Sequence, residues 1–331
     1  MEVNEPSAVM ALGRIRRTIV KTLGKDVATT FWRTDKFALP SSPKLVFLHG
    51  ADSNCLEWRY VAEKLGSTSL DCTCVDWWSG GFTDREPITQ ALVESDGALQ
   101  PWTLVREHLE AFFYQQFFDP DGPGTDENVI LIGASLGGAV AIDFAAAHPD
   151  RVKALILIDS GGESYKAPSS SAVKALAPAV LAVKSVAAWV SAKTVDLGLD
   201  ADDEQRINGL HRGERGWSEA YGAYLASGGY QAAVTPELIR TLAVPTLVIW
   251  GTDDPILPLS DAYAFQRDLP DCVGVREVRG AGHSPHLDDP AVVAKHVSTF
   301  LEELNLVSGS VTADGGTGRR ERYRQDRPPI G

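Results

Sequence analysis

The chain has 331 residues, of which 44% are hydrophobic and 23% charged, and its formal net charge is −13. A chain of this length and composition can bury a sizeable core, either as one large domain with an insertion or as two ordinary domains. The acidic excess argues against broad contact with nucleic-acid phosphates or anionic lipid surfaces, and by itself it names no partner.

Residues 1–28 form a basic N-terminal segment that we expect to be partly helical, because residues 10–25 have the pattern of an amphipathic helix. A transit peptide should be poor in acidic residues, yet Glu2 and Glu5 precede this stretch. We therefore expect a cytoplasmic protein, with import into a plastid or mitochondrion as the alternative. No apolar run reaches the roughly 20 residues that cross a bilayer, so we expect no membrane span.

The cysteines give no sign of a metal site. The chain has four of them, Cys55, Cys72, Cys74 and Cys272, and their spacing matches no common set of metal ligands. We expect them to be reduced and mostly structural, as in an intracellular compartment.

Between residues 29 and 306, short apolar runs alternate with longer helical patterns, which predicts an α/β fold with a mostly parallel sheet flanked by helices. Several runs are nearly continuous in Val, Ile and Leu, as expected for strands covered on both faces. The predicted strands are Lys44–Leu48, Asp71–Asp76, Val129–Ile132, Ala154–Asp159, Thr246–Trp250 and Gly274–Val278, with Thr30–Phe37 as a further edge strand. The predicted helices are Leu56–Leu65, Trp102–Phe118, Gly137–Ala147, Asp261–Asp268 and Ala291–Leu304. A separate pair of leading strands is not visible.

Residues 163–235 interrupt this alternation with about three helical stretches and no convincing strand. We interpret them as a helical cap inserted into the core domain of residues 29–306. The alternative is a run of extra helices packed away from any site. Residues 307–331 are rich in Gly, Ser, Thr and Arg, which predicts a disordered tail.

The strongest motif is G-x-S-x-G at residues 133–137, placed between an apolar strand and a run of small residues that opens a helix. A serine on such a sharp turn is held in a strained backbone conformation, and Gly133 and Gly137 remove side chains that would collide across it. The hydroxyl of Ser135 then stands clear at the carboxyl end of the sheet, beside a helix N-terminus that favours negative charge. This context makes Ser135 a candidate nucleophile.

A base and an acid are expected on two later loops. His283, the candidate base, lies in a Gly-rich segment after a predicted strand. His286, which follows Pro285, is the alternative base, but its position at the start of the next helix favours a structural role. Asp254 follows another strand and precedes a proline that restrains the backbone, which suits an acid that orients the histidine. Asp253 and Asp159 are the alternative acids.

These motifs resemble those of the α/β-hydrolase superfamily over roughly residues 44–306. Residues 76–84 (DWWSGGFTD) resemble the family loop D-x-x-G-x-G-x-S-D, with Ser79 and Thr83 as departures. The resemblance implies the order serine, aspartate, histidine, and the G-x-x-D-x-x-x-P spacing from Gly251 places Asp254 at the acid position. It also implies an oxyanion hole made by the backbone amides of Ala51 and Leu136, whereas the sequence by itself allows a plain strand-to-loop turn at residues 49–51.

The expected function is that of a carboxylesterase-like serine hydrolase, which cleaves an ester, thioester or related carbonyl bond of a small, largely apolar substrate through an acyl-enzyme. No metal or organic cofactor is required, and the expected partner is a small-molecule substrate, not a nucleic acid. The apolar substrate is suggested by tryptophans that can also be core residues, namely Trp77, Trp78, Trp189 and Trp217. The alternatives are a small-ligand receptor of the same fold with little turnover, and an acyltransferase. The sequence does not define an oligomeric state.

Overall fold

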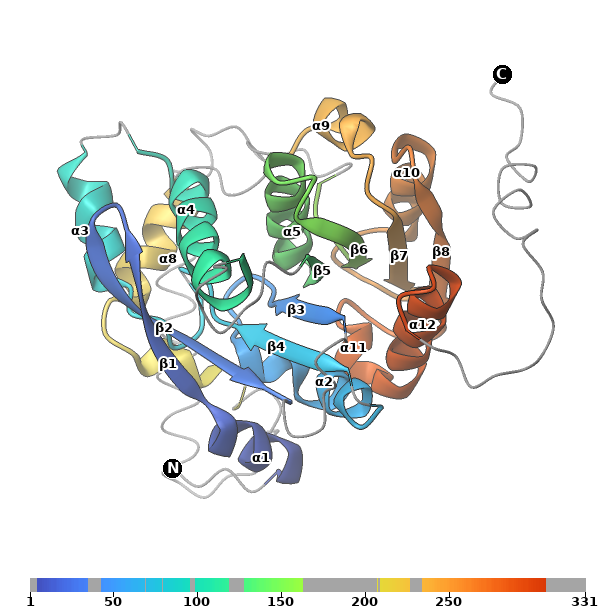
Figure 1. The fold of residues 1–331 in the computed structure, drawn as a ribbon, viewed down its shortest axis with the longest axis horizontal. Coiled ribbons are helices and arrows are strands. Elements are labelled where there is room, and N and C mark those ends of the chain that lie inside the picture. The colour runs from blue at the N-terminus through green and yellow to red at the C-terminus, as the bar shows by residue number, and fades with distance from the viewer. Residues whose placement is uncertain are drawn as a thin grey trace.

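The computed structural model describes residues 5–34, 43–68, 70–78, 80–95, 99–118, 128–162, 207, 209–226 and 234–307, with the backbone alone at 224–226. The described strands form one eight-stranded sheet in the order β1-β2-β4-β3-β5-β6-β7-β8 (Figure 1). All neighbours from β4 to β8 in this order are parallel, whereas β1 pairs with β2, and β2 with β4, in antiparallel fashion. The strands are β1 (Arg16–Thr22), β2 (Lys25–Arg33), β3 (Lys44–Leu48), β4 (Asp71–Val75), β5 (Val129–Ala134), β6 (Val152–Ile158), β7 (Thr246–Gly251) and β8 (Cys272–Val278). The predicted mostly parallel sheet is therefore confirmed.

Apolar sequence explains why β5 and β7 lie in the interior of the sheet, since every residue of VILIGA and of TLVIWG is buried. Such strands need a cover on both faces. The helices of one face are α4 (Pro101–Phe113), α5 (Leu136–Ala147) and α10 (Leu259–Asp268). The helices of the other face are α1 (Pro6–Arg14), α2 (Arg59–Gly66) and α12 (Pro290–Glu303) (Figure 1). The five helices predicted between the strands are present within these elements and the adjoining η1 (Cys55–Trp58) and η2 (Tyr114–Phe118).

The N-terminal segment differs from the expectation of one helix over residues 10–25. The helix α1 ends at Arg14, and residues 16–33 form the β1–β2 hairpin. β1 lies at the edge of the sheet, and its outward residues are exposed while Val20 and Thr22 are buried. Because the exposed positions are largely basic, the charge pattern suggested an amphipathic helix where the backbone forms a half-buried strand. The leading pair of strands that the sequence did not reveal is this hairpin.

Much of the predicted cap at 163–235 lies outside the described residues, as does the predicted tail after Val307. The part that is described holds the short turn η3 (Leu210–Gly213) and the helix α8 (Trp217–Ala226), followed by the start of α9 (Pro236–Thr241). Helix α8 contacts both α4 and α3 (Glu86–Glu94) (Figure 1). Among the described helices, none is both long and apolar enough to cross a membrane.

Candidate active site

Ser135 occupies a tight turn between the end of β5 and the start of α5. Its backbone angles are φ 51° and ψ −117°, a conformation that residues other than glycine rarely adopt. The two glycines of the motif make the turn sterically feasible. A Cβ at Gly133 would collide with the backbone of Gly137, and a Cβ at Gly137 would collide with the carbonyl of Leu48 at the end of β3. The sequence G-x-S-x-G therefore allows β5, α5 and β3 to approach each other around the serine.

The structure brings Ser135, His283 and Asp254 into one hydrogen-bonded chain. The Nε2 atom of His283 lies 2.9 Å from Ser135 Oγ, and its Nδ1 atom lies 2.7 Å from Asp254 Oδ2. The side chain of Asp254 is fully buried and that of His283 is 18% exposed. The three residues come from the segments that follow β5, β7 and β8, whose carboxyl ends meet at one edge of the sheet.

Local hydrogen bonds hold Asp254 in place. Its Oδ1 atom accepts hydrogen bonds from the backbone amides of Ile256 at 2.7 Å and Leu257 at 3.0 Å, which leaves Oδ2 for the histidine. This is the turn that a short acidic side chain forms with the backbone two residues onward. These hydrogen bonds therefore orient the Asp254 carboxylate toward His283.

The structure places the rival acids differently. Asp253 is exposed, and its Oδ1 accepts a hydrogen bond from the Thr252 hydroxyl at 3.0 Å. Asp159, which follows β6, is fully buried and accepts a hydrogen bond from the amide of Gly251 at 3.0 Å. Burial raises the pKa of Asp159 to about 8, and the charge of the neighbouring Asp254 adds to this increase. The raised pKa favours the protonated form of Asp159, which sets it apart from an acid that has to be ionised to orient a histidine.

His286 lies on the helical turn α11 (Pro285–Asp288), and its side chain is buried. Its Nε2 atom lies 2.8 Å from Glu57 Oε1, and its ring stacks on Trp58 with centroids 4.6 Å apart. The other oxygen of Glu57 accepts a hydrogen bond from the Gly50 amide at 3.3 Å. Although burial pushes the pKa of Glu57 upward, its hydrogen bond and attraction to His286 lower that pKa overall. The pair thus links the histidine loop to the loop after β3.

The two amides expected to form an oxyanion hole belong to Leu136, which follows Ser135, and to Ala51, in the loop after β3. Leu136 is the first residue of α5, so its amide has no acceptor within its own helix. The loop after β3 passes close by, because a Cβ at Gly50 would lie 3.5 Å from Ser135 Cβ. Ala51 in this loop is exposed, and Leu136 and Ser135 are partly exposed. Solvent therefore reaches the region where a substrate carbonyl would meet the serine.

The loop after β4 braces the loop after β3. Asp76 accepts hydrogen bonds from the amides of Cys55 at 2.6 Å and Phe82 at 2.7 Å. Gly81 has φ +57°, and a Cβ there would collide with the Asp76 carboxylate. Ser79, one of the departures from the family loop, lies outside the described residues. Asp76 therefore connects the loop after β4 to the loop after β3 through its carboxylate.

The tryptophans that suggested an apolar pocket are core residues where the structure describes them. Trp77 stacks on His49 and donates a hydrogen bond to its carbonyl at 3.1 Å, and Trp78 is fully buried. Trp217 is buried and donates a hydrogen bond to Asp52. Trp189 lies outside the described residues. Within the part of the chain that is described, no cluster of His, Cys, Asp or Glu has the arrangement of a metal site.

A family model described as "Alpha/beta hydrolase family" matches residues 45–296. The chain belongs to the alpha/beta hydrolase family. Among its relatives is the "alpha/beta hydrolase domain-containing protein VTE7" of Arabidopsis thaliana, 30% identical over 267 residues, which are 77% of this chain and 73% of the relative. An esterase of Mycobacterium tuberculosis is 25% identical over 272 residues, 79% of this chain and 84% of that one. This alpha/beta hydrolase also has the fold of a thermophilic esterase from Thermogutta terrifontis, with a TM-score of 0.66 at 19% identity over 87% of this chain and 99% of the other.

The structure also shows two features that the sequence had not revealed. One is the raised pKa of the buried Asp159 near Asp254, whose position after β6 had marked it only as a rival acid. The other is Asp52, directly after the expected oxyanion donor, where a buried side chain contacts His211, Arg212 and Trp217. A charged residue in an otherwise small-residue turn was the only sequence signal for Asp52.

Proposed function

We propose that this alpha/beta hydrolase is a serine hydrolase in which Ser135 attacks a carbonyl carbon. The observation that carries the proposal is the hydrogen-bonded chain from Ser135 Oγ through His283 to the buried Asp254 carboxylate. An imidazole bonded to the hydroxyl on one side and to a carboxylate on the other has the tautomer that a general base needs. The burial of Asp254 strengthens its attraction for an imidazolium.

In the proposed reaction, Ser135 Oγ forms a bond to the carbonyl carbon while His283 Nε2 takes its proton. The amides of Ala51 and Leu136 donate hydrogen bonds to the oxyanion, a contribution of about 3–4 kcal/mol per donor in other serine hydrolases. His283 then returns the proton to the leaving group, which departs as an alcohol or thiol and leaves an acyl-enzyme. Water attacks the acyl carbon by the same route and releases the acid.

The substrate proposed is a small ester or thioester, or a related carbonyl compound, with a largely apolar acyl group. The esterase names of the M. tuberculosis relative and of the T. terrifontis structure support the ester bond as the first to test. The described tryptophans do not contribute to this choice, because they are core residues. The preferred chain length of the acyl group therefore has to be measured with a series of esters.

The proposal is tested with chromogenic esters of graded acyl length. We expect turnover by the wild-type protein and none by Ser135→Ala, whereas Ser160→Ala serves as a matched control because its hydroxyl donates to the Gly161 carbonyl instead of His283. Tight binding of esters without release of product would instead indicate a receptor. Product release only in the presence of an added alcohol would indicate an acyltransferase.

A further inference from the structure

Asp52 lies directly after Ala51 and is the point where residues 207–217 meet the loop after β3. Its backbone has φ +55°, in the left-handed region that costs free energy for a residue with a side chain. Its side chain is only 1% exposed. A strained, buried carboxylate in a loop persists only where its surroundings hold it in place.

Three donors from one segment hold the Asp52 carboxylate. Oδ1 accepts hydrogen bonds from His211 Nε2 at 3.2 Å and from Trp217 Nε1 at 3.0 Å. Oδ2 forms an ion pair with Arg212 at 3.0 Å. All three donors lie on η3 or at the start of α8, so one side chain connects the loop after β3 to this segment.

A second residue of the loop completes the connection. Asn54 Nδ2 donates to the carbonyl of Ile207 at 3.1 Å and lies 3.3 Å from His211 Nδ1. His211 is fully buried, and burial lowers its pKa, an effect that Asp52 only partly opposes. A neutral His211 with its proton on Nε2 satisfies both contacts, because it donates to Asp52 and accepts from Asn54. The donors and acceptors of the cluster are therefore mutually consistent.

We infer that Asp52 is a positioning residue that fixes the Ala51 amide relative to Ser135 by anchoring the loop after β3 to residues 207–217. The inference rests on the proposed function, since it assigns a role to the oxyanion donor. The opposite side of the same loop is held by Glu57 through the Gly50 amide at 3.3 Å. Along the chain, Ala51 thus lies between Gly50, whose amide donates to Glu57, and Asp52, whose carboxylate is held by residues of η3 and α8.

The chemistry predicts which quantity depends on Asp52. An oxyanion donor acts on the transition state and hardly at all on the ground state, so its displacement lowers kcat and leaves KM nearly unchanged. It also weakens the binding of a trifluoromethyl ketone, whose serine adduct has an oxyanion. A side chain that only stabilised the fold would change neither kcat nor the affinity for the ketone in the folded protein.

The test uses Asp52→Gly, which removes the anchor while glycine tolerates the positive φ, and Trp217→Phe, which removes one donor and keeps an aromatic ring to stack on Tyr221. The matched control is Asp143→Asn, another buried carboxylate paired with an arginine, on α5 and facing α4. Each variant is assayed well below its Tm, with kcat normalised to the fraction of chains that a fluorophosphonate labels at completion.

We expect Asp52→Gly to lower kcat and trifluoromethyl ketone affinity in parallel by about 10- to 100-fold, Trp217→Phe by about 2- to 5-fold, and Asp143→Asn by less than 2-fold. If Asp52→Gly does not fold, the parallel loss in Trp217→Phe and Asp52→Asn decides the question. Variants at both positions with wild-type kcat and ketone affinity would overturn the inference and leave the proposed function intact. A wild-type chain that neither turns over esters nor reacts with the fluorophosphonate would overturn both.

Discussion

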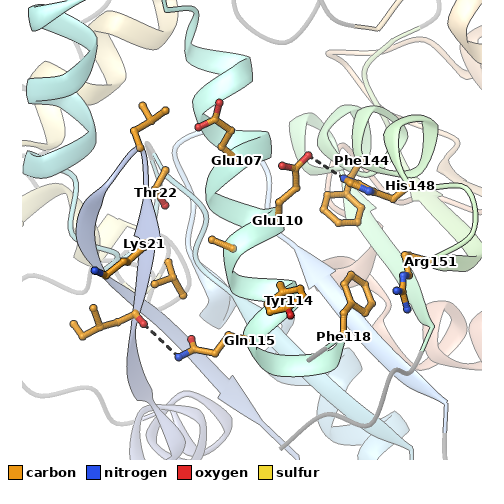
Figure 2. Close-up of a pocket in the computed structure, with 14 residues that line it drawn as sticks. Lys21, Thr22, Glu107, Glu110, Tyr114, Gln115, Phe118, Phe144, His148 and Arg151 are labelled. Atoms are coloured by element: carbon orange, nitrogen blue, oxygen red, sulfur yellow. Dashed lines mark hydrogen bonds and ion pairs between the residues drawn. The ribbon is translucent and has the colours of Figure 1, made fainter. Parts of the chain in front are cut away.

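Two acid–histidine pairs of this protein differ in how exposed they are and in what the histidine contacts. In the open groove of Figure 2, His148 Nε2 lies 2.9 Å from Glu110 Oε1, and both side chains are about one-third exposed. At the other pair, His283 lies 2.7 Å from the fully buried Asp254. His148 packs against the ring of Phe144, whereas His283 contacts the hydroxyl of Ser135 at 2.9 Å.

The groove shows that volume alone does not indicate an active site. It measures about 870 Å³ and is bordered by β1, α4 and the end of α5, at the opposite end of α5 from Ser135 (Figure 2). Its acid–histidine pair is screened by water and faces an aromatic ring. At the other pair, the turn after β5 places the Ser135 hydroxyl against His283, and the turn after β7 holds the buried carboxylate of Asp254. The candidate site therefore lies at the strand ends and not in this groove.

The largest expected effect is that of Ser135→Ala. Removal of the only hydroxyl that the proposal assigns to bond formation should lower kcat by about six orders of magnitude, the loss seen when a serine hydrolase loses its nucleophile. Because the turn stores strain and the hydroxyl contributes little to packing, we expect the Tm to stay nearly unchanged. Stopped and continuous ester assays with scanning calorimetry measure both. Substantial residual turnover would remove Ser135 from the mechanism.

The second effect separates the adjacent aspartates. Asp254→Asn should lower kcat by about 10⁴, because the amide favours the wrong tautomer of His283 while the nucleophile remains in place. Asp253→Asn is the matched control, since its exposed side chain contacts only the neighbouring threonine among the described residues, and it should stay within about 2-fold of the wild type. Similar losses in the two variants would contradict the assignment of Asp254.

The third effect concerns Asp159 and appears in stability, with kcat nearly normal. Its folded-state pKa of about 8 lies above its ordinary value of 3.8, so protonation stabilises the folded chain and this contribution is lost as the pH rises through 8. Asparagine mimics the protonated acid toward both Gly251 and Asp254. Asp159→Asn should therefore have a higher Tm than the wild type at pH 8.5, with a difference that shrinks toward pH 5. A Tm difference independent of pH, or a crippled kcat, would show that Asp159 is ionised or acts as the acid.

The smallest effects should come from the exposed pair in the groove. Glu110→Gln and His148→Gln remove an ion pair that contributes at most about 1 kcal/mol, because water and salt screen it. Both variants should keep wild-type kcat and unfold within a few degrees of the wild-type Tm. A marked loss of turnover in either variant would mean that the groove takes part in the reaction.

Much of the fold could be predicted from sequence because it depends on local patterns. Short apolar runs such as β3, β5 and β7 indicate strands that are covered on both faces. The glycines around Ser135 indicate a tight turn. The β1–β2 hairpin was missed because an edge strand with basic outward residues resembles the polar face of a helix. The pattern alone did not distinguish the two.

The candidate site follows the same rule. His283 and Asp254 could be proposed from their neighbours, since glycines permit a tight loop around His283 and Pro255 restrains the backbone of Asp254. The raised pKa of Asp159 and the anchoring of Asp52 depend on residues about 95 and 160 positions away in the chain. Tertiary contacts of this kind leave no mark in the spacing of a single sequence.

The most direct test of the account is the reaction of the wild-type protein with a fluorophosphonate, followed by intact-mass measurement and peptide mapping. The account predicts one adduct per chain, located on Ser135, with a reaction rate that falls in Asp254→Asn and not in Asp253→Asn. An unmodified chain, or an adduct on any other residue, would contradict the assignment of Ser135 as the nucleophile and with it the proposed function.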